Sequence, residues 1–497
     1  MSRPGSELRR RAARGLLWSA AESWGAQAIS VLVFVVLSRY LAPEAFGLLG
    51  MAAVFVALVQ TLVDQGMSDA LVQRETVEDG HRDTAFWTAL GGGAVLAAAG
   101  WALSGLVAAG YGEPDLGPVV AWLSLTVLVR SLAATQTALL RRSLDFRPLA
   151  LRSLGGTLAG GMVGVGMAAA GYGVWALVGQ QLATAAVGTV LLWFASDWRP
   201  GRGVSRRAFR ELFPFGARVV AGNLVNFLNR HTDDLFIGLY LGAAALGFYT
   251  VGYRLLLAAT AILTGFSSAV AFPVFSRLQG DPDRLRAGLY QATRLTAMLA
   301  FPTFIGAAVL APDLIVVLFG DRWLAAAPVM RILAFIGILH AIFYLTNNAF
   351  YAVGQAATVL WLNVLNAVTN VIAFWIAARW GIVVVAAAYV VRGYLVAPVR
   401  LALLRRAVGI GIPRYLRELA APVTATVIMA ATVLGALTVA GVSDPAARIA
   451  IGVPLGMLAY LAALRLVDPA GLRTVFDLGR EAFDRSIARA PAEQPDA

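Results

Sequence analysis

The chain has 497 residues, of which 59% are apolar and only 14% are charged. Soluble domains carry roughly 25% charged residues, and no stretch of this chain is polar enough to be one, so the composition excludes a soluble enzyme or binding domain. All 40 basic residues are arginine and the net charge is +12, but most lie in short breaks between apolar runs. That distribution is typical of a membrane protein and not of a nucleic-acid-binding one.

The start of the chain resembles a signal peptide, with five arginines before an apolar run. The run extends over 16–38, which is longer than a signal core, and no clear small-residue cleavage site follows it. We therefore predict an uncleaved first membrane helix with a cytoplasmic N-terminus.

Apolar runs predict an all-α polytopic membrane protein of about fourteen transmembrane helices. Six precede an arginine-rich segment: 16–38, 46–66, 85–109, 118–140, 149–170 and 173–195. Six follow it: 213–241, 245–272, 295–319, 329–351, 357–378 and 381–404. A final pair is predicted at 419–441 and 446–467.

The distribution of the arginines predicts how these helices are oriented in the membrane. With the N-terminus inside, 31 of the 40 arginines belong to cytoplasmic segments and four to the opposite loops. This bias places both termini in the cytoplasm. The turn 352–356 (AVGQA) is the weak point, because it should be cytoplasmic and has no arginine.

The two groups of six helices show an internal repeat. A shift of 200 residues lays 40–47 (YLAPEAFG) on 240–247 (YLGAAALG), and a shift near 209 lays 84–90 on 293–299. Matches in this order predict two six-helix lobes related by an axis along the membrane normal. The predicted domains are an N-lobe (1–195), a cytoplasmic basic connector (196–212), a C-lobe (213–405), two C-terminal helices (406–467), and a cytoplasmic amphipathic helix with a disordered tail (468–497).

Several short segments occur in a characteristic order: 64–74 (DQGMSDALVQR), 229–238 (NRHTDDLFIG), 246–249 (LGFY) and 272–279 (FPVFSRLQ). This series resembles the oligosaccharide flippases of the polysaccharide-transporter family, in its colanic-acid-exporter-like branch. The same superfamily includes multidrug exporters and the lipid II flippase. The resemblance covers roughly residues 10–410.

The resemblance implies a cargo and a location. Such a protein moves a polyprenyl-diphosphate-linked oligosaccharide across the bacterial inner membrane before polymerisation, in the synthesis of exopolysaccharide, capsule, O-antigen or lipopolysaccharide. A polysaccharide polymerase and chain-length machinery are candidate partners, and nucleic acid is not expected as one.

Polar residues concentrate in the helix 213–241. Asn223, Asn226, Arg230, and Asp233 with Asp234, follow one another at spacings of three or four and share one face. In one interpretation Arg230 pairs with an aspartate and the stripe is structural. In the other it lines a pathway, where arginine binds diphosphate and a carboxylate binds the coupling cation.

Other charges within spans are further candidates. Arg130 and Arg392 lie mid-span, and Arg254 follows Tyr253 in a family-like segment, although such arginines also snorkel to an interface or bond neighbouring carbonyls. Glu22 in the first helix faces either water or a coupling ion. The predicted substrate cavity contains Arg230, Arg254, Arg130, Arg392, Asn226, Asn223 and Tyr253, and the ion-coupling candidates are Asp233, Asp234 and Glu22.

Asparagines form a second polar seam, at Asn347 and Asn348 and at Asn363, Asn366 and Asn370. The last three share a helix face. Hydrogen bonding between helices is the favoured interpretation, and a sugar-facing surface is the alternative.

Ion-coupled alternating access is the leading hypothesis. The chain has no lysine and so no phosphate-binding G-x-x-x-x-G-K-[ST] loop, which makes a proton or sodium gradient the expected energy source. No cofactor or metal is expected, since the chain has no cysteine and three scattered histidines.

Two alternatives remain from the sequence. A multidrug or cation exporter of the same superfamily would favour carboxylates and aromatic residues, whereas these spans contain more arginines than acidic residues. A polytopic glycan ligase or polymerase would need a larger external loop for catalysis, so we do not expect an enzyme.

Overall fold

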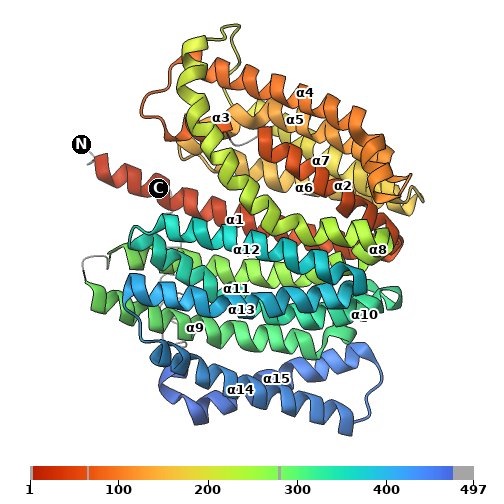
Figure 1. The fold of residues 1–497 in the computed structure, drawn as a ribbon, viewed down its shortest axis with the longest axis vertical. Coiled ribbons are helices and arrows are strands. Elements are labelled where there is room, and N and C mark those ends of the chain that lie inside the picture. Colours follow the sequence, from red (N-terminus) through yellow and green to blue (C-terminus); the bar gives the residue numbers. More distant parts are fainter. Residues whose placement is uncertain (1–3, 64–65, 278–280, 474–497) are drawn as a thin grey trace, which may run out of the picture. The chain divides into compact units, whose positions relative to one another are not determined.

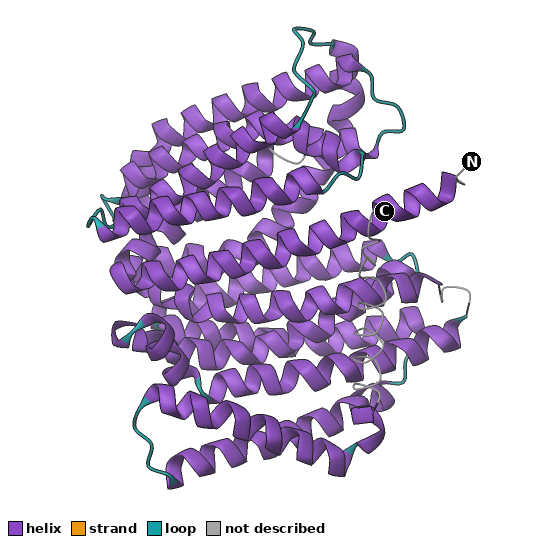
Figure 2. Ribbon diagram, turned by 180° about the vertical axis from the view of Figure 1, so that it is seen from behind, coloured by secondary structure: helices purple, strands orange, loops and turns teal. Residues whose placement is uncertain are grey.

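The computed structural model describes residues 4–63, 66–277 and 281–473, and the regular elements over these ranges are all helices (Figure 2). The α-helices of the first half are α1 (Pro4–Tyr40), α2 (Pro43–Val63), α3 (Gly66–Gln73), α4 (Asp79–Tyr111), α5 (Leu116–Arg142), α6 (Arg147–Ala169) and α7 (Val174–Ala195). The second half contains α8 (Arg206–Arg277), α9 (Pro282–Val309), α10 (Ala311–Phe319), α11 (Ala327–Ala352), α12 (Ala356–Ala377), α13 (Ile382–Val408), α14 (Ile412–Val439) and α15 (Pro445–Val467). Two short 3₁₀ segments, Asp321–Ala326 and Ala378–Trp380, complete the chain.

Helices occur at every position where an apolar run predicted one, with two differences. The run 295–319 is divided between α9 and α10. The runs 213–241 and 245–272 belong to the single element α8, which breaks at Gly242 with φ 81° and ψ −179°. Only glycine adopts this backbone conformation readily, because it has no Cβ atom. The break between the predicted helices 213–241 and 245–272 is therefore the single residue Gly242.

Twelve stretches of the described residues are long and apolar enough to cross a membrane. One of them, Arg206–Ala261, runs through the break at Gly242, and α6 is not among the twelve. The protein is thus an all-α multi-pass membrane protein. The side on which each terminus lies stays a prediction, and so do the domain boundaries. The predicted amphipathic tail around Phe476 and Phe483 lies outside the described residues.

The chain divides into two compact units. The first comprises Met1–Arg254, Leu318–Val329 and Leu360–Arg392. Within it, α4 packs along α5, and α6 packs against both α7 and α1 (Figure 1). Gly156, Gly160 and Gly164 recur at every fourth position on the face of α6 that meets α7. Small residues at this spacing let membrane helices approach closely, which explains the tight pairing.

The second unit comprises Leu255–Val317, Met330–Val359 and Gly393–Ala497. In it α14 pairs with α15 and packs on α9. The buried residues at this junction are apolar and include Met298, Ala425, Met429 and Ala463. Together with the phenol of Tyr460, which donates to the carbonyl of Met298 across 2.8 Å, they attach the last two helices to the unit.

Candidate functional site

A buried carboxylate, that of Asp233, lies in the first unit. The hydroxyl of Tyr249 donates to Oδ2 of Asp233 across 2.9 Å, and Asp233 is only 4% exposed. The two residues are separated by sixteen positions, which would place them about 24 Å apart along a straight helix. Their contact therefore depends on the reversal of α8 at Gly242. The second oxygen of Asp233 has no hydrogen-bond partner among the described residues.

Aromatic residues extend from this carboxylate to an arginine. The ring of Tyr253 lies 5.9 Å from that of Tyr249 and 6.4 Å from that of Tyr389, and the hydroxyls of Tyr253 and Tyr389 are hydrogen-bonded. The guanidinium of Arg392 stands 5.1 Å over the ring of Tyr389. Helices α8 and α13 thus connect Asp233 to Arg392 by continuous side-chain contacts. We call these five residues the Asp233–Arg392 cluster.

Asparagines from α8 and α12 form hydrogen bonds with this cluster and with one another. Arg392 donates to Oδ1 of Asn366 across 2.7 Å. Asn370 donates to the side chain of Asn229 across 3.2 Å, and Asn229 donates to the carbonyl of Asn363 across 3.0 Å. The asparagine seam therefore makes hydrogen bonds between helices, as its favoured interpretation predicted. Asn229 itself, one helical turn before Asp233, was not among the candidates, although its i−4 spacing would have indicated it.

The other predicted site residues of α8 lie outside the Asp233–Arg392 cluster and have different neighbours. Arg254 donates to the hydroxyl of Ser30 across 2.7 Å and lies 5.1 Å over the ring of Phe34. Asn226 and Arg230 are exposed, and Asn223 is half-buried. Asp234 lies 3.5 Å from the ring of His231. Among the described residues Arg230 forms no ion pair with Asp233 or Asp234, so the structural pairing considered for this stripe is not found.

Glu22 and Arg130 lie together in a different part of the first unit. They line a polar cavity of about 360 Å³ between α1, α5, α6 and α7. A second cavity, of about 280 Å³, adjoins α3 and shares Arg130 with the first. Both cavities are also lined by Arg141 and Arg152. These two arginines were assigned to cytoplasmic helix ends, although Arg130 and Arg141 are three helical turns apart and so lie on one face of α5.

The second unit contains a buried arginine that the sequence did not single out. Arg400 on α13 is 3% exposed and was counted with the cytoplasmic charges. Its guanidinium donates to Thr346 across 3.1 Å and to Asn347 across 2.6 Å, and it lies 4.6 Å over the ring of Phe343. The polar pair Asn347 and Asn348 was the available signal on the opposing helix.

Helix ends and turns close one end of the first unit. Trp323 is fully buried, and its indole N–H donates to the carbonyl of Ser38 across 3.0 Å. Arg322 donates to the carbonyl of Arg39 across 2.7 Å, and Arg39 donates in return to the carbonyl of Leu318 across 3.0 Å. The segment after α10 is thereby joined to the end of α1. Both arginines are predicted to lie on the outer side.

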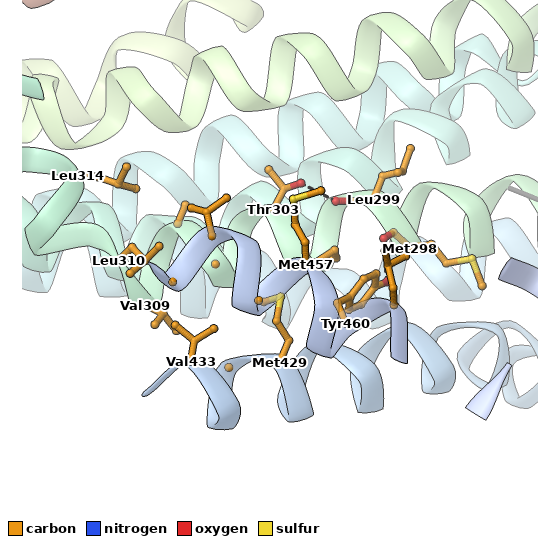
Figure 3. A pocket seen from close by; sticks show the side chains of 18 residues that line it. Met298, Leu299, Thr303, Val309, Leu310, Leu314, Met429, Val433, Met457 and Tyr460 are labelled. Atoms are coloured by element: carbon orange, nitrogen blue, oxygen red, sulfur yellow. Dashed lines mark hydrogen bonds between the residues drawn. The ribbon is translucent and has the colours of Figure 1, made fainter. Parts of the chain in front are cut away.

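An apolar cavity of about 520 Å³ lies in the second unit, between α9, α14 and α15 (Figure 3). Its wall includes Leu299, Leu310, Met429 and Met457, and none of its lining residues is charged. Such a cavity can accommodate hydrocarbon but offers nothing to a diphosphate or a cation. Over the described residues no group of three or more histidine or acidic side chains could hold a metal ion.

Comparison with known proteins shows the family of this chain. The model of a family described as "Polysaccharide biosynthesis protein" matches residues 36–328, more than half of the sequence. The chain belongs to this family. One relative is similar over nearly the whole length: the succinoglycan biosynthesis transport protein ExoT of Rhizobium meliloti (strain 1021) is 26% identical over 97% of this chain and 98% of its own.

A second relative is similar over two thirds of the chain, and one solved structure shows the fold. The lipopolysaccharide biosynthesis protein WzxC of Escherichia coli (strain K12) is 28% identical over 67% of this chain and 68% of its own. The inward closed conformation of the lipid II flippase MurJ superposes with a TM-score of 0.72, over 91% of this chain and 98% of MurJ, at 15% identity. The chain therefore has the fold of that flippase, as its resemblance predicted.

Proposed function

We propose that this protein moves a polyprenyl-diphosphate-linked oligosaccharide from the cytoplasmic to the outer leaflet of the bacterial inner membrane. The chain is a membrane transporter of a polysaccharide-biosynthesis family and not an enzyme. The names of its relatives associate them with succinoglycan and lipopolysaccharide, and MurJ is a flippase of lipid II. A lipid-linked glycan is the cargo that these associations have in common.

The Asp233–Arg392 cluster is the observation that carries the proposal. It holds a carboxylate and a guanidinium within helices long and apolar enough to span a membrane, and each of these charges needs a partner there. Arg392 presents a planar fork of donors suited to diphosphate oxygens, while Asn366 orients it. Arg254, Arg230 and the amides of Asn223 and Asn226 add further donors on α8 for the diphosphate and glycan.

Asp233 is the proposed coupling residue. Its second oxygen is buried and has no hydrogen-bond partner among the described residues, so a proton or a sodium ion would satisfy it. Asn229, one helical turn before Asp233, carries an amide oxygen, and oxygen is the ligand type that a hard cation takes. Asp234 and Glu22 are secondary candidates. Because no phosphate-binding loop exists in the sequence, the ion gradient drives the cycle.

Alternating access requires the closed end of the first unit to open. The contacts of Trp323, Arg322 and Arg39 with backbone carbonyls would break as the outer side becomes accessible. The apolar cavity between α9, α14 and α15 suits the polyprenyl chain, which stays in hydrocarbon while the head group crosses. Both termini remain cytoplasmic in this scheme, and a polysaccharide polymerase would receive the product outside.

A cation exporter is the second candidate, for one specific reason. Three tyrosines packed beside a buried carboxylate also suit an organic cation, which aromatic faces and a negative charge attract. The two functions differ in what Arg392 does, since a cationic cargo would be repelled by it.

Reconstituted vesicles separate these functions. Labelled lipid-linked oligosaccharide incorporated in the inner leaflet should become accessible to an external enzyme when an ion gradient is applied, and Arg392→Gln should slow this transfer by about tenfold or more. Arg392→Lys should recover part of the rate. Efflux of a cationic dye that persists or improves in Arg392→Gln, with no glycan transfer by the unsubstituted protein, would replace the flippase proposal by the exporter.

A further inference from the structure

The strongest unassigned feature is the arginine-lined space in the first unit. Two adjoining cavities, of about 360 and about 280 Å³, share the lining residues Arg130, Ala133, Thr137, Arg141 and Arg152. Sites for small molecules begin near 300 Å³, so the space is of the right size for a small ligand. None of the residues of the Asp233–Arg392 cluster lines it.

The arginines are held by different elements and converge on this space. Arg130 and Arg141 come from one face of α5, with Thr137 between them, and Arg152 comes from α6. Arg152 donates to the hydroxyl of Thr137 across 2.9 Å, which fixes the direction of its guanidinium. Ala133, Ala185 and Gly188 are small, and this leaves the space in front of the three guanidiniums open.

Two of the guanidiniums are available to a ligand. Within the described part of the chain, the side chains of Arg130 and Arg141 make no hydrogen bond or ion pair, although both border the cavities. Their neighbour Arg142 differs: it donates to the backbone carbonyls of Leu71 and Val72, across 3.2 Å and 3.4 Å, and does not line either cavity. The sequence Arg141-Arg142 therefore supplies one arginine to the cavity and one to the end of α3.

The charge of the lining is positive. Two carboxylates, Glu22 and Asp69, face three arginines, and neither carboxylate lies within ion-pair distance of them among the described residues. Burial raises the pKa of Asp69, and Arg141 opposes this rise. The three guanidiniums thus outnumber the two carboxylates of the lining.

From these contacts we infer that Arg130, Arg141 and Arg152 form a binding site for a phosphate or diphosphate group. Guanidinium forks match phosphate oxygens bidentately, and the hydroxyls of Ser153 and Thr157 add donors along α6. The α5–α6 connection is predicted to be cytoplasmic, so an anion would enter this site from the side on which the cargo is made. The site would receive the head group before it reaches the Asp233–Arg392 cluster, a step that rests on the proposed function.

Binding of inorganic pyrophosphate to the full-length protein in maltoside micelles tests the site directly. Arg130→Gln, Arg141→Gln and Arg152→Gln should each weaken the apparent affinity by about tenfold or more. Arg147→Gln is the matched control: Arg147 is exposed on α6, five residues before Arg152, and lines neither cavity. Arg141→Lys should bind with intermediate affinity. Thermal midpoints recorded without ligand show that each variant is folded.

Competition with bound pyrophosphate shows whether the phosphate group that binds here belongs to the lipid-linked cargo or to a membrane phospholipid. Undecaprenyl diphosphate should displace pyrophosphate from the protein, whereas phosphatidylglycerol at equal concentration should not if the cargo is the ligand. Equal displacement by phosphatidylglycerol would assign the site to membrane phospholipid. Absence of pyrophosphate binding, or an affinity that the three variants leave unchanged, overturns the inference. Retained binding in a protein that transfers no lipid-linked glycan would overturn the proposed function and leave the site standing.

Discussion

A Cβ atom on Gly47 would lie 1.7 Å from the carbonyl oxygen of Ala243, so α2 meets the backbone of α8 at a distance that only glycine permits. The contact has a counterpart: a Cβ atom on Gly247 would lie 2.0 Å from the carbonyl oxygen of Pro43. A shift of 200 residues converts 43 into 243 and 47 into 247. Reciprocal contacts of this kind arise when a two-fold axis relates the two segments.

The first prediction concerns this glycine pair. Gly47→Ala and Gly247→Ala should each lower the stability of the purified protein by about 1–3 kcal/mol or more, because the added methyl group meets backbone that cannot rotate away. Thermal unfolding in detergent measures the effect. Gly92→Ala is the control, since a Cβ atom there meets nothing within 4 Å and alanine favours a helix by up to about 1 kcal/mol. Equal midpoints for all three variants would contradict the close approach.

The same segments show what the sequence could predict. Apolar runs located the helices because a spanning helix must be apolar over its whole length, and the repeat aligned the segment 40–47 with 240–247. Hydropathy averages over a window, however, and therefore cannot separate a buried arginine near a helix end from one that reaches the interface. This explains why Arg400, which is 3% exposed, was counted with the cytoplasmic arginines.

Contacts between helices that are distant in the chain could not be predicted from the sequence either. Tyr253 and Tyr389 are 136 positions apart, and nothing in a single sequence shows that their rings meet. One interpretation of the polar stripe on α8 paired Arg230 with Asp233 or Asp234, and this pair is not found among the described residues. The reversal at Gly242 instead brings Tyr249 to Asp233, because a tight turn lets the second leg of α8 pack along the first.

The second prediction tests coupling at Asp233. Asp233→Asn removes the ionisable group but keeps an acceptor for Tyr249, so we expect the protein to fold and to lose its response to an imposed gradient. Glycan transfer in vesicles should become slow and independent of both the pH difference and the sodium difference. The coupling ion is the one whose gradient stimulates transfer by the unsubstituted protein but not by Asp233→Asn. Tyr249→Phe, which keeps the carboxylate, should retain a gradient response, and loss of the response in both variants alike would instead indicate a structural role for this pair.

The third prediction concerns Arg400. The guanidinium of Arg400 donates hydrogen bonds to Thr346 and Asn347 inside the second unit. Buried hydrogen bonds to a charged group contribute about 1.5–3 kcal/mol each to the free energy of unfolding. Arg400→Gln should therefore lower the thermal midpoint markedly. Arg406→Gln, an exposed arginine on the same helix, should leave it nearly unchanged. A small effect at both positions would mean that Arg400 is satisfied by water rather than by its neighbours.

The fourth prediction concerns the pH dependence of stability at Asp468, which follows the end of α15. Arg294 donates to Oδ2 of Asp468 across 2.8 Å, and the amide of Gly471 donates to Oδ1 across 2.9 Å. Burial of this carboxylate opposes its ionisation. The hydrogen bonds outweigh that effect, so the pKa of Asp468 lies below its ordinary value of 3.8.

Because the pKa of Asp468 is lowered on folding, the stability that its carboxylate contributes must fall as the pH falls. The ionised carboxylate stabilises the fold fully above pH 3.8, and this contribution disappears as the pH falls through the lower pKa of the folded state. Asp468→Asn should therefore cost about 1–3 kcal/mol at neutral pH, and the difference from the unsubstituted protein should shrink below about pH 4. Thermal unfolding between pH 3 and pH 7 measures it.

Asp283 provides the control for this measurement. It pairs with Arg286 at the start of α9, but its side chain is 86% exposed, so solvent screens the interaction. Asp283→Asn should leave the midpoint unchanged within error at every pH. If Asp468→Asn behaves in the same way, the Arg294–Asp468 pair does not hold α15 to α9, and the apolar contacts of Tyr460 and Met298 would have to attach the last two helices without it.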